Sequence, residues 1–226
     1  MTTEVLVFSR AKSPKGRYLS NIVRDEYDPY GEAVSVAAKS AEAAFQWSKV
    51  RLMLGKAVET DDRALKLKKA FYQAQGFHNA KFLGGKTSFR KFKLTNVFND
   101  AKWKGRFDDH FSQSDLDQVT MDILEFMCPT ERFHVVRRYG EKARRILEHA
   151  EVECSTRALV MAIIVVCRME FDAAFCDIIF EYKKKVKYAH RGGRIDPFWG
   201  QNRMYGLNVY GRILGVLYSL YESELM

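Results

Sequence analysis

The sequence predicts an α+β fold that is predominantly helical, with a few short strands in a single domain. Several long stretches repeat apolar residues at three- and four-residue steps, which is typical of helices that bury one face. Runs typical of strands are short. The chain has 226 residues, of which 47% are hydrophobic, and this is enough for one domain with a sizeable core.

The first part of the chain is expected to begin with a strand and continue in helices. Residues 4–8 suggest a short strand, and a basic loop follows it. A helix is predicted near 34–54 and another over 61–75, with Gly76 as a stop. The buried stripe of the first helix is predicted to contain Val34, Ala38, Ala41, Phe45 and Leu52.

The second part is also expected to be mainly helical. Residues 86–113 have no clear period and are expected to be irregular or strand-bearing. A helix is predicted from Ser114, which can cap it, to Pro129, which ends it. Two more helices are expected over 140–150 and 155–180, and a last helical or strand-like element over 212–221.

No segment is typical of a membrane span or a signal peptide. The apolar run from Ala158 to Cys167 is too short to cross a bilayer, and the N-terminus lacks a basic and then apolar pattern. The four cysteines form no Cys-x-x-Cys pair and have no histidine at ligand spacing. This pattern favours a reducing compartment and argues against structural zinc. We therefore expect an intracellular protein, cytoplasmic or nuclear, with no membrane partner.

The charge of the chain favours anionic partners. Its net charge is +9 and its pI is near 9.3, which suits nucleic acid, a dinucleotide or a phosphorylated sugar. Basic residues crowd between 183 and 203, around Asp196-Pro197-Phe198-Trp199-Gly200. A Trp beside an Asp suits a flat ring with polar edges, and glycine lets a ligand come close. The alternative interpretation is a packed turn beside a solvated basic face.

The helix predicted near 34–54 places an acid and an amine on one face. Glu42 and Lys49 lie seven residues apart, about 10 Å along the axis, at the edge of the apolar stripe, and Gln46 lies slightly further round. A half-buried acid and a half-buried amine are costly unless they are paired or used. Either each finds a partner elsewhere, or Lys49 is a nucleophile toward a sugar aldehyde and Glu42 moves the proton.

Several motifs occur in an order that points to a known family. They are Ser20-Asn21, Ser40-Ala41-Glu42 with Gln46 and Lys49, Ala80-Lys81-Phe82-Leu83-Gly84, Arg168-Met169-Glu170-Phe171, Asp196-x-x-Trp199-Gly200, Asn208 and Gly211. On these motifs the chain resembles the NADAR (NAD- and ADP-ribose-associated, YbiA-like) family over roughly 5–85 and 158–222. The resemblance implies one NADAR-like domain over residues 1–226, with an insertion at about 86–155. Two departures are Ala43, where the family often has His, and Glu170-Phe171 in place of a Lys-Phe pair.

The resemblance implies an N-glycosidase without cofactor. Some family members cleave phosphorylated riboflavin-pathway intermediates, and others remove ADP-ribose from guanine through a Schiff base between a lysine and the opened ribose. Carried over by position, the catalytic residues are Lys49 and Glu42. The substrate-binding residues are Ser20, Asn21, Gln46, Asp196, Trp199, Gly200 and Asn208.

Three functions follow as hypotheses. The first is an ADP-ribosyl hydrolase acting on ADP-ribosylated guanosine nucleotide or nucleic acid, as in reversal of DNA ADP-ribosylation. The second is an N-glycosidase of ribosylaminopyrimidine phosphates of the riboflavin pathway. The third is a non-catalytic reader of ADP-ribose or nucleic acid. The high pI and the extra segment favour the first, and we expect catalysis without metal.

Overall fold

The computed structural model describes residues 4–7, 14–21, 23, 26–55, 57–74, 77–94, 112–128, 136–182, 186–189, 198–199 and 206–225. Helix predominates among them, which confirms the helical part of the prediction. The elements are β1 (Glu4–Val7), α1 (Pro14–Tyr18), α2 (Val36–Leu54), α3 (Ala57–Thr60), α4 (Asp62–Tyr72), α5 (Phe77–Leu83), α6 (Lys86–Lys91), α8 (Gln113–Met127), α9 (Val136–His149), α10 (Thr156–Phe171), α11 (Ala173–Tyr182), β2 (Val186–Ala189) and α12 (Val209–Leu225).

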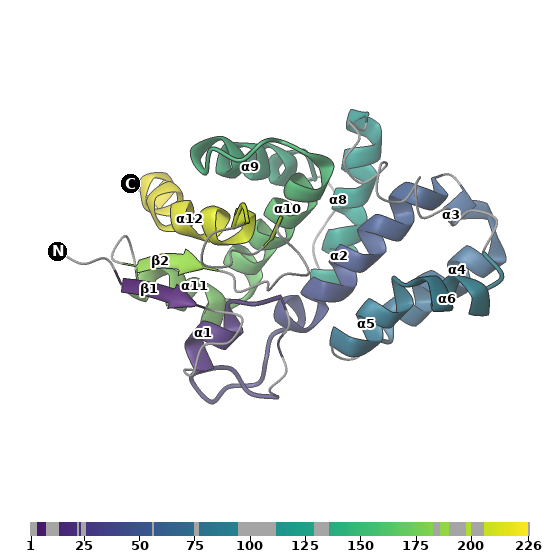
Figure 1. Ribbon diagram of the computed structural model, residues 1–226, viewed down its shortest axis with the longest axis horizontal. Helices are drawn as coiled ribbons and strands as arrows, with labels where there is room; N and C mark the ends of the chain where they lie inside the picture. The colour runs from purple at the N-terminus through teal and green to yellow at the C-terminus, as the bar shows by residue number, and fades with distance from the viewer. Residues whose placement is uncertain are drawn as a thin grey trace.

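Two long helices, α2 and α10, contact each other and organise the core. Helix α8 packs against α2, and α9 packs against α10 (Figure 1). Helices α3 to α6 gather at one end of the molecule, where α4 and α5 contact α2. At the other end, β1 and β2 pair in parallel, with Val5 opposite Lys187, and β2 packs against α12. The sheet thereby joins segments from near the two ends of the chain.

Helix α2 is buried on nearly all sides. Its N-cap is Ser35, whose hydroxyl accepts the N–H of Ala38 at 3.1 Å, so the helix begins two residues later than predicted. The predicted stripe is buried, as expected. The opposite face is buried as well, because Trp47, Ser48 and Arg51 are also covered in the folded protein. The sequence pattern predicted one buried face, whereas α2 has two.

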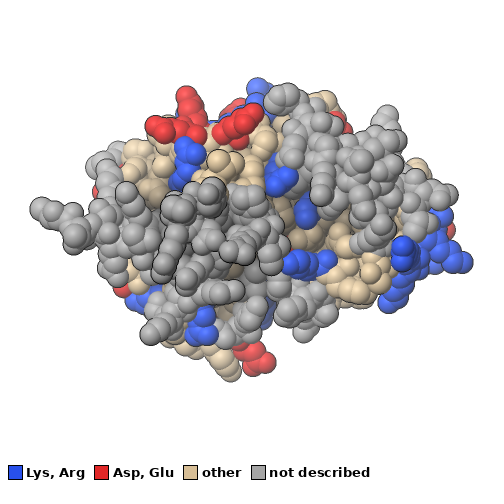
Figure 2. Space-filling model, in the orientation of Figure 1, with Lys and Arg blue, Asp and Glu red and all other residues tan. Residues whose placement is uncertain are grey.

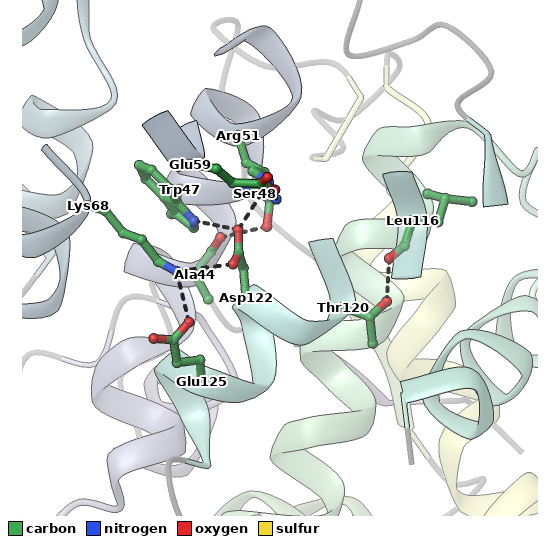
Figure 3. Close-up of polar contacts among 10 residues, drawn as sticks. All are labelled: Ala44, Trp47, Ser48, Arg51, Glu59, Lys68, Leu116, Thr120, Asp122 and Glu125. Carbon is green, nitrogen blue, oxygen red and sulfur yellow. Dashed lines mark hydrogen bonds and ion pairs between the residues drawn. The ribbon is translucent and has the colours of Figure 1, made fainter. Parts of the chain in front are cut away.

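A buried carboxylate fastens this second face to α8. Asp122 is 1% exposed and accepts a hydrogen bond from the indole N–H of Trp47 at 2.8 Å and one from Lys68 Nζ at 3.3 Å (Figure 3). Arg51 lies 3.6 Å away through its Nε and also binds Glu59. A buried charge is tolerated when it is paired in this way. Helix α8 therefore belongs to the core. That residues 86–155 are an insertion relative to a family remains a prediction.

Other elements differ from the prediction as well. Helix α8 is capped by Ser112, whose hydroxyl accepts the N–H of Asp115 and donates to its carboxylate, so the helix begins before Ser114. The long helix expected over 155–180 is two helices, because Asp172 leaves helical geometry and its carboxylate accepts the N–H of Phe175. The segment over 86–113 includes helix α6, and residues 95–111 and Gly76 lie outside the described part of the chain.

Candidate active site

Three side chains of α2 form one hydrogen-bonded chain. Gln46 Nε2 donates to Glu42 Oε1 at 2.8 Å, and Lys49 Nζ donates to Gln46 Oε1 at 3.1 Å. Gln46 is 7% exposed, and Glu42 and Lys49 are partly buried. The predicted acid and amine are therefore linked by hydrogen bonds to the amide that lies between them. Gln46, predicted to bind substrate, uses one amide N–H and its oxygen within this chain.

The pKa of the acid in this chain lies above that of an ordinary glutamate. Burial raises the pKa of the Glu42 carboxyl above its ordinary value. The hydrogen bond from Gln46 and the positive charges of Lys49 and Lys81 lower it, but the net shift remains upward. Glu42 can thus hold a proton at a pH where an exposed glutamate has lost it, as a general acid requires.

Helix α5 ends against the middle side chain of these three, Gln46. A Cβ built on Gly84 would lie 2.5 Å from Gln46 Oε1 and 3.2 Å from Gln46 Cβ, so this position accepts only glycine without movement. The close approach also brings Lys81 of α5 within electrostatic reach of Glu42. The Ala80–Gly84 motif, which the resemblance singled out without assigning it a role, therefore lies against the centre of the candidate site.

Aromatic rings cover the amine end of the chain. Lys49 Nζ lies 5.2 Å from the centroid of the Phe45 ring, and the Trp199 ring meets Phe45 edge-on at 5.6 Å. Trp199 in turn packs edge-on against Phe198 at 4.6 Å. The Phe198 carbonyl accepts the N–H of Val209 at 3.2 Å, which ties this turn to the start of α12.

The closing motif predicted from the sequence is thus only partly described. Trp199 lies against α2, where its ring contacts Phe45. Asn208 precedes α12 with a left-handed φ of 47°, and its carbonyl accepts the N–H of Arg212 at 2.9 Å. Asp196 and Gly200 lie outside the described residues.

The Ser20-Asn21 loop is buried and is held by two helices, α10 and α12. Tyr210 Oη lies 2.9 Å from both the Leu19 carbonyl oxygen and Asn21 Oδ1, while Asn21 Nδ2 donates to Met161 Sδ at 2.9 Å. Arg168 donates to the Ser20 carbonyl at 2.9 Å. The predicted substrate-binding amide of Asn21 therefore already has protein partners on both of its polar atoms.

A buried ion pair underlies this loop. Arg168 is 0% exposed and lies 2.9 Å from Asp172, and it also donates to the Tyr18 carbonyl. The Tyr18 hydroxyl donates to Asp172 at 2.8 Å. Every group of the pair is satisfied, which is the condition for a charge in the core.

Electrostatics connects the loop with the helix. Burial raises the pKa of the Tyr210 hydroxyl to about 12, and the negative charge of Glu42 acts in the same direction. Tyr210 is thus a neutral donor within electrostatic reach of Glu42. Through Tyr210, the predicted residues Asn21 and Glu42 belong to one neighbourhood.

The sequence reasoning missed several members of this neighbourhood. Their signals were present but had no assigned role: Lys81 and Gly84 sit in a quoted motif, and Arg168 and Asp172 are four residues apart around an apolar helix. Tyr210 carried no signal, because its partners are far away in sequence.

Comparison with known proteins does not extend the assignment. No protein-family model, no curated protein and no solved structure matches the chain. The NADAR resemblance therefore stays a prediction. Within the described residues, no helix is both long and apolar enough to span a membrane.

Proposed function

We propose that the protein is an N-glycosidase that removes ADP-ribose from guanine through a Schiff base on Lys49. The observation that supports this best is the hydrogen-bonded chain of Glu42, Gln46 and Lys49 on α2. An acid whose pKa is raised by burial and an amine, linked by one amide and partly buried, are the two groups that the reaction needs. The aromatic rings of Phe45 and Trp199 beside the amine suit the flat base of a nucleoside.

The first chemical step forms a bond from Lys49 to the sugar. Lys49 first loses a proton to solvent and then attacks C1 of the ribose as the neutral amine, and the bond from C1 to the guanine nitrogen breaks with its electron pair going to the base. Glu42 donates its proton to that nitrogen, and its carboxylate then accepts the proton that the Lys49 nitrogen loses.

The second step opens the sugar ring and the third releases it. The bond from C1 to the ring oxygen breaks, the oxygen receives the proton held by Glu42, and a protonated imine forms between C1 and the Lys49 nitrogen. Water then adds to C1 and gives one proton to the Glu42 carboxylate and one to the departing amine, so free ADP-ribose, unmodified Lys49 and protonated Glu42 are regenerated.

Lys49→Ala tests this function with ADP-ribosylated guanosine as substrate. We expect kcat/KM to fall by about 10³-fold or more, because the nucleophile is gone. Lys39→Ala is the matched control, since Lys39 is an exposed lysine of the same helix and should retain full activity. Normal turnover by Lys49→Ala would sink the mechanism.

The same assay separates the alternatives. Preference for a ribosylaminopyrimidine phosphate over ADP-ribosylated guanosine would assign the protein to the riboflavin-pathway substrates, with the same two catalytic residues. Binding of ADP-ribose with no turnover of either substrate would make it a reader.

A further inference from the structure

The positive charge of the chain is concentrated in one acid-free segment. Residues 63–94 contain nine Lys and Arg and no Asp or Glu. The remaining 28 Lys and Arg are balanced by 28 Asp and Glu, so this segment accounts for the whole net charge of +9. The nine are Arg63, Lys66, Lys68, Lys69, Lys81, Lys86, Arg90, Lys91 and Lys93.

The fold gathers this segment at one end of the molecule. It forms α4, α5 and α6, and Arg63 donates to the Lys93 carbonyl at 3.1 Å, which joins the start of α4 to the end of α6. Figure 2 shows Lys and Arg atoms clustered at the right-hand edge, where these helices lie in Figure 1. Arg63 and Lys81 are also exposed, but Arg63 pairs with Asp61 and Lys81 is within electrostatic reach of Glu42. We use the term basic surface for the other five exposed members, Lys66, Lys69, Arg90, Lys91 and Lys93. Among the described residues, none of these five side chains forms an ion pair, whereas Lys68 turns inward to Asp122 and Glu125.

The end of α6 keeps a lysine where the backbone favours glycine. Lys93 has a left-handed φ of 56°, with its N–H bonded to the Arg90 carbonyl at 3.0 Å and the Leu94 N–H bonded to the Phe89 carbonyl at 2.8 Å. This is the Schellman ending of a helix, in which glycine is the usual residue at that position. A lysine at a position that favours glycine suggests that the lysine side chain has a function of its own. Here the side chain adds a third exposed cation beside Arg90 and Lys91.

An exposed aromatic ring lies on α5, the helix whose end approaches Gln46 of the candidate site. Phe82 is 52% exposed on α5, one residue from Lys81 and two from Gly84, which touches Gln46. Helix α5 also packs against α6. Cations that neutralise phosphates, together with a ring on which a base can stack, are the two parts of a surface for single-stranded nucleic acid.

We infer that the basic surface and Phe82 bind the backbone and a base of a single-stranded nucleic acid and lead it to the candidate site. The inference rests on the proposed function and deepens it, because it makes a nucleic-acid strand, rather than a free nucleotide, the carrier of the modified guanine. A single strand fits because its bases are already unstacked and accessible to the ring and to the site.

The test measures binding of unmodified 20-nucleotide DNA, RNA and duplex DNA by fluorescence anisotropy at 50 and 200 mM salt. If four of the cations contact phosphates, single-strand affinity of the wild type should fall about 50-fold over this range. The triple variant Arg90→Gln, Lys91→Gln, Lys93→Gly should lower the salt slope by about 2. Lys93→Gly alone should weaken binding without lowering the Tm, because glycine suits the backbone at this position. Its weaker binding therefore cannot come from misfolding. Phe82→Ala should weaken binding about 5-fold or more.

The matched control removes the same charge from another helix. Arg137→Gln, Arg138→Gln, Arg145→Gln alters exposed arginines of α9 and should leave binding unchanged. Equal weakening by both triple variants would mean that only net charge matters and would overturn the inference. So would tighter binding of duplex DNA, of polyglutamate or of phosphatidylserine vesicles than of the single strands.

The outcome for the surface is distinguishable from the outcome for the catalytic proposal. Lys49→Ala should bind oligonucleotides like the wild type. The α6 triple variant should cleave ADP-ribosylated guanosine normally but an ADP-ribosylated oligonucleotide at least 10-fold more slowly. If it cleaves both normally, the surface is wrong and the N-glycosidase stands. If neither the wild type nor any variant cleaves either substrate, but single strands bind as expected, the proposed nucleic-acid surface is supported and the proposed N-glycosidase function is wrong.

Discussion

Replacing Gly84 by alanine puts a methyl group into the space that the Gln46 side chain occupies. The new Cβ would lie 2.5 Å from Gln46 Oε1, and Gln46 Cβ and Cδ follow at 3.2 Å. Gln46 is buried and is held at both ends by hydrogen bonds to Glu42 and Lys49. Its side chain therefore cannot turn away without breaking them.

The expected cost follows from this geometry. Overpacking of a buried site costs about 1–3 kcal/mol, and each lost hydrogen bond about 1 kcal/mol. We therefore expect Gly84→Ala to lower the free energy of unfolding by about 2 kcal/mol. Gly140→Ala is the control, because a Cβ at Gly140 meets nothing within 4 Å in helix α9, and it should stabilise the protein by about 0.5–1 kcal/mol.

Urea unfolding of a double-mutant cycle measures the contact itself. In a Gln46→Ala protein the methyl group at position 84 has room, so most of the cost of Gly84→Ala should disappear, with a coupling of about 1–2 kcal/mol. If Gly84→Ala costs the same with and without Gln46, the close approach is not the cause and the reasoning fails.

The remaining predictions concern three carboxyl groups, those of Glu42, Asp122 and Asp172. Because burial raises the folded-state pKa of Glu42, the carboxyl contributes stability at low pH that is lost as the pH rises through that pKa. Glu42→Gln should therefore gain stability relative to the wild type from pH 4 to pH 8 in urea unfolding, and a constant difference would contradict the shift. The wild-type kcat/KM should fall over the same rise in pH, since the general acid loses its proton. Asp122→Ala leaves Trp47, Lys68 and Arg51 without their shared acceptor and should cost about 3–5 kcal/mol in unfolding free energy; a loss below 1 kcal/mol would show that the network is dispensable. Asp172→Ala strands Arg168 in the core and should cost about the same, with faster amide exchange around residues 18–21; unchanged exchange there would mean that the pair does not hold the loop.

Helical periodicity predicted the elements better than their ends. The stripe on α2 was readable because Val34, Ala41 and Phe45 recur locally. The cap of α8 was misplaced although Ser112 accepts the N–H of Asp115, because Ser114 offered an equally good local cap. The break at Asp172 escaped because its two roles, capping α11 and pairing with Arg168, appear only in the folded chain.

The candidate site divides in the same way. Glu42, Gln46 and Lys49 were predicted together because one helix fixes their spacing. Tyr210 and Met161 are 189 and 140 residues from Asn21, so no local pattern could connect them to the loop. The charge was also read too narrowly: the run at 183–203 drew attention, whereas the acid-free segment is at 63–94.

The most direct test of the central claim is borohydride trapping during turnover. Wild-type protein mixed with ADP-ribosylated guanosine and sodium borohydride should gain the mass of a reduced ADP-ribose adduct, and peptide mass spectrometry should locate it on Lys49. The Lys49→Ala protein should gain none, and Lys39→Ala should label like the wild type. An adduct on another lysine, or turnover at full rate without any adduct on Lys49, would contradict the Schiff-base mechanism.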